Sequence, residues 1–268
     1  MDVEAMDLLI QFFAQTDIFM LVFVRVLAFI LVLPIVASMN IPMMTRVFLA
    51  LVVSVAVFLS GLVTTVYYVD STAGYVFLVI QEFLAGMAMG YVVFSVFNLI
   101  FFVGQIIDFQ IGLMLVNVMD PMTQIQVPIM GNLYYLALMG MLVASGGLHQ
   151  LFGVFFQSYV VLPIGTAMVL GNEALAWGFV MLLVESTVIA VRISLPILGA
   201  MLVVNAALGI MVKTVPQMNI FVVGLPIKLL VGLILIYAVM TPALYTMFRL
   251  VYDLAFRGLI EVILGMSP

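Results

Sequence analysis

Side chains that could carry chemistry are few and far apart in this sequence. The single histidine, His149, follows a Gly-Gly pair and is explained more simply as an interfacial polar residue than as a general base. The sequence has no cysteine, no phosphate-binding Gly-x4-Gly-Lys loop, no His-Glu-x-x-His pair and no nucleophile elbow. We therefore expect no enzymatic activity and no bound metal or cofactor.

A sparse set of charges flanked by apolar residues is a second candidate site. Glu185 and Arg192 are spaced by two helical turns, so they share one face of a helix, and Lys213 and Lys228 follow further on. Charges inside apolar segments form ion or proton paths in some transporters. They also pair neighbouring helices or subunits, and we favour that interpretation here.

Small residues repeat near Glu82. Gly86 and Gly90 form a Gly-x3-Gly pattern, which lets a second helix approach closely in a membrane. Glu82 lies one turn earlier on the same face. Two interpretations stay open for this carboxylate: an interfacial residue, or a buried contact to a cation of a partner.

The elements that must position these residues are membrane helices. Hydrophobic residues make up 67% of the chain and charged residues only 7%, far fewer than soluble domains carry. Charges also lie near the ends of long apolar runs: residues 26–45, 47–69, 83–107, 193–212 and 229–248 contain none. Runs of about 20 apolar residues match the thickness of a bilayer. The net charge of −5 and the absence of a basic run give no indication of nucleic-acid binding.

The predicted fold is all-α, with polytopic membrane helices arranged as kinked helical hairpins. Apolar segments are expected near residues 17–39, 43–66, 74–104, 127–145, 149–168, 173–211 and 218–257. Breaks and kinks are expected at the prolines inside these runs, because proline removes a backbone donor. These prolines are Pro34, Pro163, Pro196, Pro226 and Pro242.

One stretch, residues 104–126, fits neither a lipid-facing helix nor a solvated loop. It mixes glycines, amides and two aspartates, Asp108 and Asp120, with large apolar residues that include Met114 and Met119. Irregular backbone at membrane depth is tolerated only where it is buried in protein or lines a cavity. Methionine is flexible and suits a deformable contact surface. We therefore expect this stretch to lie inside a protein assembly.

Several motifs together resemble the FliR family of flagellar export-gate subunits. They are the first helix with Arg25 and Pro34, the run from Glu82 to Gly90, and Gly104-Gln105 with Asp108, Gln110, Gly112 and Asp120-Pro121. The most specific is PQMNIFVVGLPIK, from Pro216 through Gln217 and Asn219 to Lys228. The resemblance covers nearly the whole chain, so we expect a single domain over 1–268, with N-terminal hairpins over 1–170 and a long C-terminal hairpin over 171–268.

The resemblance implies a structural subunit of a bacterial type III protein-export gate in the inner (cell) membrane, at the flagellar basal body. The implied partners are FliP-like and FliQ-like gate subunits, an FlhB-like switch protein, unfolded export substrates and membrane lipid. Family members plug the closed channel with the segment that matches Gln105 to Met122. The implied plug residues are Asp108, Phe109, Gln110, Gly112, Met114, Met119 and Asp120. We expect subunit contacts at Glu82, Gly86, Gly90, Glu185, Arg192, Lys213, Gln217, Asn219 and Lys228.

Two other functions stay open at this point. A virulence secretion gate of the same family would share these motifs. A secondary transporter of a small solute would also place charges within kinked helices, although such transporters usually contain two related halves, which this sequence lacks.

Overall fold

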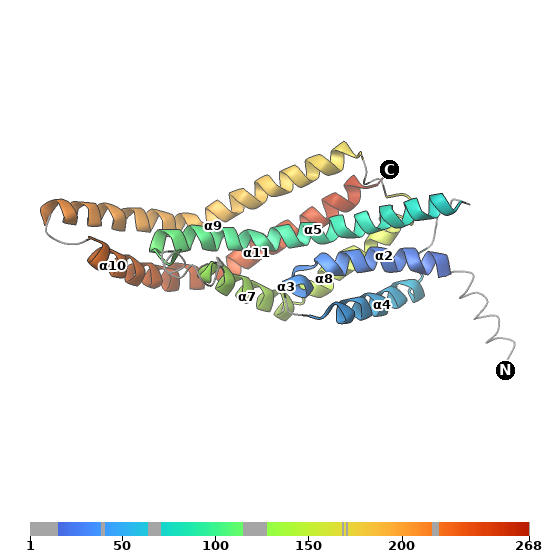
Figure 1. Cartoon of the computed structure of the whole chain (residues 1–268), viewed down its shortest axis with the longest axis horizontal. Coiled ribbons are helices and arrows are strands. Elements are labelled where there is room, and N and C mark those ends of the chain that lie inside the picture. The colour runs from blue at the N-terminus through green and yellow to red at the C-terminus, as the bar shows by residue number, and fades with distance from the viewer. Residues whose placement is uncertain are drawn as a thin grey trace. The chain divides into compact units, whose positions relative to one another are not determined.

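The computed structural model describes residues 16–38, 41–63, 71–114, 128–167, 169, 171–215 and 220–267. Its regular elements are helices, shown in Figure 1, which confirms the all-α prediction. In chain order they are α2 (Thr16–Val32), α3 (Pro34–Ser38), α4 (Met43–Leu59), α5 (Thr72–Ile111), α7 (Ile129–Ala144), α8 (Gly147–Val161), α9 (Glu173–Thr214), α10 (Ile220–Leu235), the π-helix η1 (Ile236–Met240) and α11 (Thr241–Gly265).

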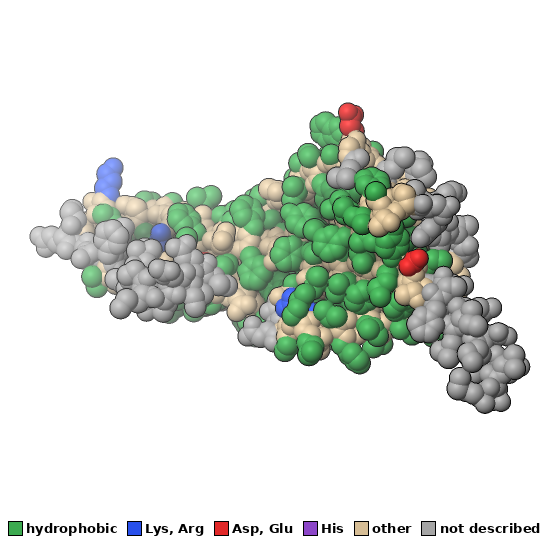
Figure 2. All heavy atoms as spheres, turned by 45° about the vertical axis from the view of Figure 1, so that its right-hand side comes forward, with side chains coloured by type: hydrophobic (Ala, Val, Ile, Leu, Met, Phe, Trp, Pro, Cys, Tyr) green, Lys and Arg blue, Asp and Glu red, His purple; other side chains and the backbone are tan. Residues whose placement is uncertain are grey.

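Three stretches of helix within the described residues are long and apolar enough to cross a bilayer. They are α5, α9 and the segment Val222–Val239, and α7 with α8 adds a fourth if the pair forms one broken span. Large apolar side chains of α9 face outward, and Leu202 and Val203 are more than half exposed. Hydrophobic side chains also cover most of the described surface in the view of Figure 2. The chain is therefore a polytopic membrane protein, as its charge spacing predicts.

Three of the five prolines lie near the point where a helix ends, begins or changes form. Pro34 opens α3 directly after α2 ends, and Pro163 follows α8. Pro242 is the second residue of α11, which follows the π-helix, whereas α9 and α10 continue through Pro196 and Pro226. A proline inside a helix cannot donate to the carbonyl four residues earlier, which favours a local distortion.

One predicted boundary is wrong. The third apolar helix is predicted to end near residue 104, where polar residues begin, but α5 continues as regular helix to Ile111. The charged side chain that falls inside this extension, Asp108, is buried and hydrogen-bonded to another helix, and Gln105 and Gln110 are exposed or half-buried. The polarity of Asp108 is satisfied by a tertiary contact, so it does not end the helix.

The chain divides into two compact units. Unit 1 contains residues Met1–Ser95, Leu148–Leu182 and Ala255–Pro268, and unit 2 contains Val96–Gly147 and Leu183–Leu254. Both units therefore combine segments from the two predicted halves, 1–170 and 171–268. Within unit 1, the rings of Phe29 and Phe155 stack at 4.2 Å between centroids in the core. In unit 2, Ile107 and Leu138 are fully buried.

Candidate functional site

A glycine in a left-handed conformation ends α5 in unit 2. Gly112 has φ +88°, and its N–H donates to the carbonyl oxygen of Asp108 at 3.1 Å. This bond closes the last helical turn, in a conformation that a Cβ atom would strain. The chain therefore turns out of the helix at Gly112. Residues 115–127, among them the predicted plug residues Met119 and Asp120, lie outside the described residues.

The carboxylate of Asp108 caps the start of α7. Its two oxygens lie 3.4 and 3.3 Å from the backbone nitrogen of Met130, and the side chain is only 4% exposed. Amides in the first turn of a helix have no partner within it, and the N-cap residue of α7, Pro128, makes no side-chain cap bond. Asp108 thus supplies from α5 the acceptor that α7 lacks locally. The positive end of the helix dipole also favours the carboxylate there.

Two glycines bring α5 and α7 into main-chain contact beside this cap. A Cβ atom on Gly104 would overlap the backbone of Gly131, and one on Gly131 would lie 3.2 Å from the Cα of Phe101. Next to the glycines, the rings of Phe101 and Tyr135 stack with centroids 4.8 Å apart. A carboxylate cap and a close helix crossing therefore join the last turns of α5 to the start of α7.

A third helix of unit 2, α10, packs against the end of α5. A Cβ atom on Gly232 would overlap the side chain of Ile111, and the Cγ of Leu225 lies 3.8 Å from the Cβ position of Gly112. We call the meeting point of these three helices the loop base, comprising residues 104–112, 128–135 and 225–232. At its edge Phe109 is 70% exposed and Met114 is 44% exposed, while Gln110 is half-buried.

Unit 1 contains a buried ion pair, formed by Arg25 of α2 and Glu82 of α5. Both side chains are fully buried, and the Arg25 Nε donates to Glu82 Oε2. The Arg25 Nη1 also donates to the carbonyl of Leu162 at 3.0 Å, and the N–H of Gly165 donates to Glu82 Oε1 at 3.0 Å. Burial of a charge in an apolar core is strongly unfavourable unless it is paired and hydrogen-bonded, as this pair is.

An aromatic ring completes the arrangement. The guanidinium carbon of Arg25 lies 4.6 Å from the ring centroid of Tyr159, within cation–π distance, and the Tyr159 hydroxyl donates to the carbonyl of Val22 at 3.2 Å. We refer to Arg25, Glu82, Tyr159 and the backbone groups of Leu162 and Gly165 as the Arg25 cluster. It joins α2 and α5 to α8 and to the chain that follows α8.

Comparison with known proteins identifies the family of the chain. The family profile of bacterial export proteins, family 1, matches residues 17–254. The chain belongs to the FliR family of bacterial export proteins. It is 29% identical over 237 residues to the flagellar biosynthetic protein FliR of Bacillus subtilis strain 168, covering 88% of this chain and 90% of the relative. It is 28% identical over 230 residues to FliR of Escherichia coli K12, covering 86% and 87%. The Pectobacterium carotovorum FliR is 30% identical over 240 residues, covering 87% and 88%.

The glycine pair of this FliR-family chain contacts its own α2. A Cβ atom on Gly86 would overlap the carbonyl oxygen of Arg25, and one on Gly90 would lie 2.9 Å from the carbonyl oxygen of Phe29. Glu82 of α5 pairs with Arg25 of α2. The assignment of Glu82, Gly86 and Gly90 to subunit contacts is therefore corrected. The close approach predicted by Gly-x3-Gly occurs, but within one chain, because α2 carries the charge that neutralises Glu82.

The other proposed contact residues lie in or near unit 2. Glu185, Arg192 and Lys213 are exposed on α9, and Lys228 is half-buried on α10. Their exposure leaves them available to partners, so their role in subunit contacts stays a prediction. Gln217 and Asn219 lie outside the described residues.

Sequence reasoning did not assign roles to several residues that organise these sites. Arg25 was noted only as part of a motif, and Tyr159, Gly131 and Gly232 were not singled out. Arg25 carried a usable signal, since a lone arginine within an apolar helix requires a counter-charge. Gly131 and Gly232 carried none, because glycine is common in membrane helices for many reasons.

Proposed function

We propose that this chain is a structural subunit of the flagellar protein-export channel, and that residues 105–122 close its pore. The observation that carries the proposal is the loop base. It joins the end of α5 to the start of α7 by buried contacts and leaves the bulky apolar residues Phe109 and Met114 exposed beside it. The names of the relatives, flagellar biosynthetic proteins, favour the flagellar branch over the virulence branch.

A seal needs a firm support and a deformable contact surface. The loop base provides the support, because Gly104 and Gly131 allow no gap between the helices and Asp108 ties them together. Methionine and phenylalanine side chains can exclude water and still rearrange around a passing polypeptide.

Other subunits are expected on the exposed apolar faces. Phe48 and Leu59 of α4 and Val203 of α9 are more than 60% exposed, so lipid or protein must cover them. We propose that FliP-like and FliQ-like subunits pack there and that an FlhB-like protein docks on the assembly. The sequence lacks a nucleotide-binding loop, so the chain serves as a conduit and not as a motor or an enzyme.

The test is to co-express the chain with FliP-like and FliQ-like proteins from the same source and to measure ion leak through the reconstituted assembly. Inserting two glycines after Phe109 displaces the plug from the loop base and is expected to raise conductance well above that of the parent. The matched control replaces Gly153, whose surroundings are open, with alanine and is expected to stay tight. Recovery of only the lone chain would refute the gate assignment. A glycine-insertion variant with the same conductance as the parent would refute the plug assignment alone.

A further inference from the structure

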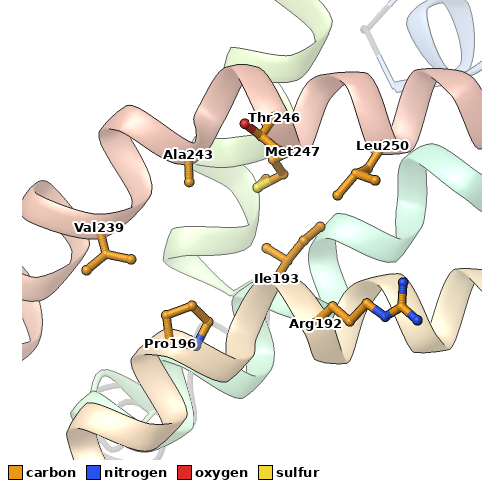
Figure 3. A pocket seen from close by; sticks show the side chains of 8 residues that line it. All are labelled: Arg192, Ile193, Pro196, Val239, Ala243, Thr246, Met247 and Leu250. Carbon is orange, nitrogen blue, oxygen red and sulfur yellow. The ribbon is translucent and has the colours of Figure 1, made fainter.

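A groove in unit 2 lies between α9 and the π-helix with the start of α11. Figure 3 shows Arg192, Ile193 and Pro196 along one wall, with Val239 and Met247 on the opposite wall. The groove has a volume of about 170 Å³. Solute sites usually enclose about 300–1,000 Å³, so a small molecule would not be enclosed here. Part of one apolar chain, laid along the two helices, would fill it.

The groove exists because both of its walls are irregular. Pro196 cannot donate the usual helical hydrogen bond to the carbonyl of Arg192, and residues 236–240 opposite it form a π-helix. Short π-helical segments widen a helix locally and occur often at functional sites. Neither feature is used by the loop base or by the Arg25 cluster.

A cation lies at one end of this apolar groove. The Arg192 side chain is exposed, and it makes neither a hydrogen bond nor a salt bridge with any residue in the described ranges. The hydroxyl of Thr246 is the other polar group among the lining side chains, and Thr246 is exposed too. In Figure 3 the guanidinium group extends along α9 away from Pro196, so the groove has a charged end and an apolar end.

Arg192 lies at the end of one charge-free run of helix, and a second charge-free run ends beside it. Residues 193–212 and 229–248 contain no charged side chain, and each run is long enough, at about 30 Å of helix, to cross the hydrocarbon core. The groove places Arg192 beside Leu250 and Pro196 beside Val239, so the two runs lie antiparallel. Arg192 and Arg249 therefore border the same end of the apolar zone.

We propose that this groove binds an anionic phospholipid, with the phosphate at Arg192 and one acyl chain against Ile193, Pro196 and Met247. Charge complementarity selects the occupant. Two arginines border this end of the apolar zone, and the nearest acidic residues on these helices, Glu185 and Asp253, lie beyond them on the side away from the charge-free runs. Arginine binds phosphate through paired, charge-assisted hydrogen bonds.

The absence of cysteine allows a local test with the full chain. A Leu250→Cys variant carries a fluorophore at the groove, and a Val203→Cys variant carries it on an exposed position of α9 away from the groove. Each is reconstituted in vesicles of phosphatidylcholine with a small fraction of quencher-labelled phosphatidylglycerol or quencher-labelled phosphatidylcholine. We expect phosphatidylglycerol to quench the label at residue 250 more strongly than phosphatidylcholine, and the label at residue 203 to be quenched equally by both.

The Arg192→Gln substitution then separates headgroup recognition from general contact with lipid. We expect it to reduce the apparent association of phosphatidylglycerol at residue 250 by about tenfold, the loss of one charge-assisted hydrogen bond. Lys213→Gln removes an equal charge elsewhere on α9 and is expected to leave quenching at residue 250 unchanged. Circular dichroism and elution volume confirm that both variants fold.

Several results would overturn the proposal. Equal quenching by the two lipids at residue 250 would show that the groove has no anionic site. Equal loss in the Arg192→Gln and Lys213→Gln variants would indicate diffuse charge attraction. Displacement of phosphatidylglycerol by millimolar inorganic phosphate would identify a free-anion site. Protection of the label by a second copy or by a partner subunit, with no lipid dependence, would identify a protein interface.

Discussion

The Arg25 cluster yields a prediction that can be worked out quantitatively. Glu82→Gln keeps an oxygen that accepts from the Gly165 N–H but leaves the Arg25 cation buried without a counter-charge. Arg25→Met leaves the Glu82 anion buried and removes the donor to the Leu162 carbonyl. Removing one partner of a buried ion pair costs about 3–5 kcal/mol, so each single variant should lose stability of that order.

The double variant Arg25→Met with Glu82→Gln contains no buried charge at this site. Its remaining losses are an unpaired Leu162 carbonyl and an incompletely bonded amide, each worth about 1–2 kcal/mol. It should therefore be no less stable than either single variant. If the two substitutions acted independently, the double variant would lose the sum of the two single losses, about twice the loss of either single variant. The expected double loss is smaller than this sum by at least about 3 kcal/mol, which is the coupling energy.

The assay is unfolding of the purified chain in mixed detergent micelles by increasing sodium dodecyl sulfate. Fluorescence of the single tryptophan, Trp177, reports on unit 1, which also contains the cluster. Glu185→Gln is the matched control, because Glu185 is exposed on α9, and it should change stability by less than about 0.5 kcal/mol. If the double variant lost the sum of the two single losses, the ion pair would not form in the folded chain and the reasoning would be refuted.

Three further predictions concern the close helix contacts and the loop base. Gly86→Ala should destabilise unit 1 by about 1–3 kcal/mol in the same unfolding assay, through overlap with a backbone oxygen, whereas Gly153→Ala, in open space, should be neutral or stabilising. Asp108→Leu should strongly speed hydrogen exchange of the Met130 amide. Asp108→Asn should speed it only modestly, since asparagine retains an acceptor. Equal exchange rates in the two variants would contradict the cap. Gly112→Ala should lose about 1–2 kcal/mol because of its positive φ, and no loss in unfolding would show that α5 ends differently.

Local patterns in the sequence predicted the helices well. Hydrophobicity and charge spacing act over one helix at a time. The predicted segments 74–104 and 173–211 lie within α5 and α9, and the predicted segment 43–66 begins with α4, which ends at Leu59. Helices break at Pro34 and end before Pro163, because the effect of proline on the backbone is local, but α9 and α10 continue through Pro196 and Pro226. The family also followed from sequence, because a run of residues such as Pro216 to Lys228 is specific by itself.

The partners of polar and small residues were decided only by the tertiary structure. Glu82 and Arg25 are 57 residues apart, and Asp108 and Met130 are 22 apart, so no local pattern connects them. The spacing of Gly86 and Gly90 indicates a close helix contact but not which helix makes it. Seven basic residues were available in the sequence as a counter-charge for Glu82. Only packing selects one of them, because a buried charge is stable where the fold brings its opposite within hydrogen-bonding distance.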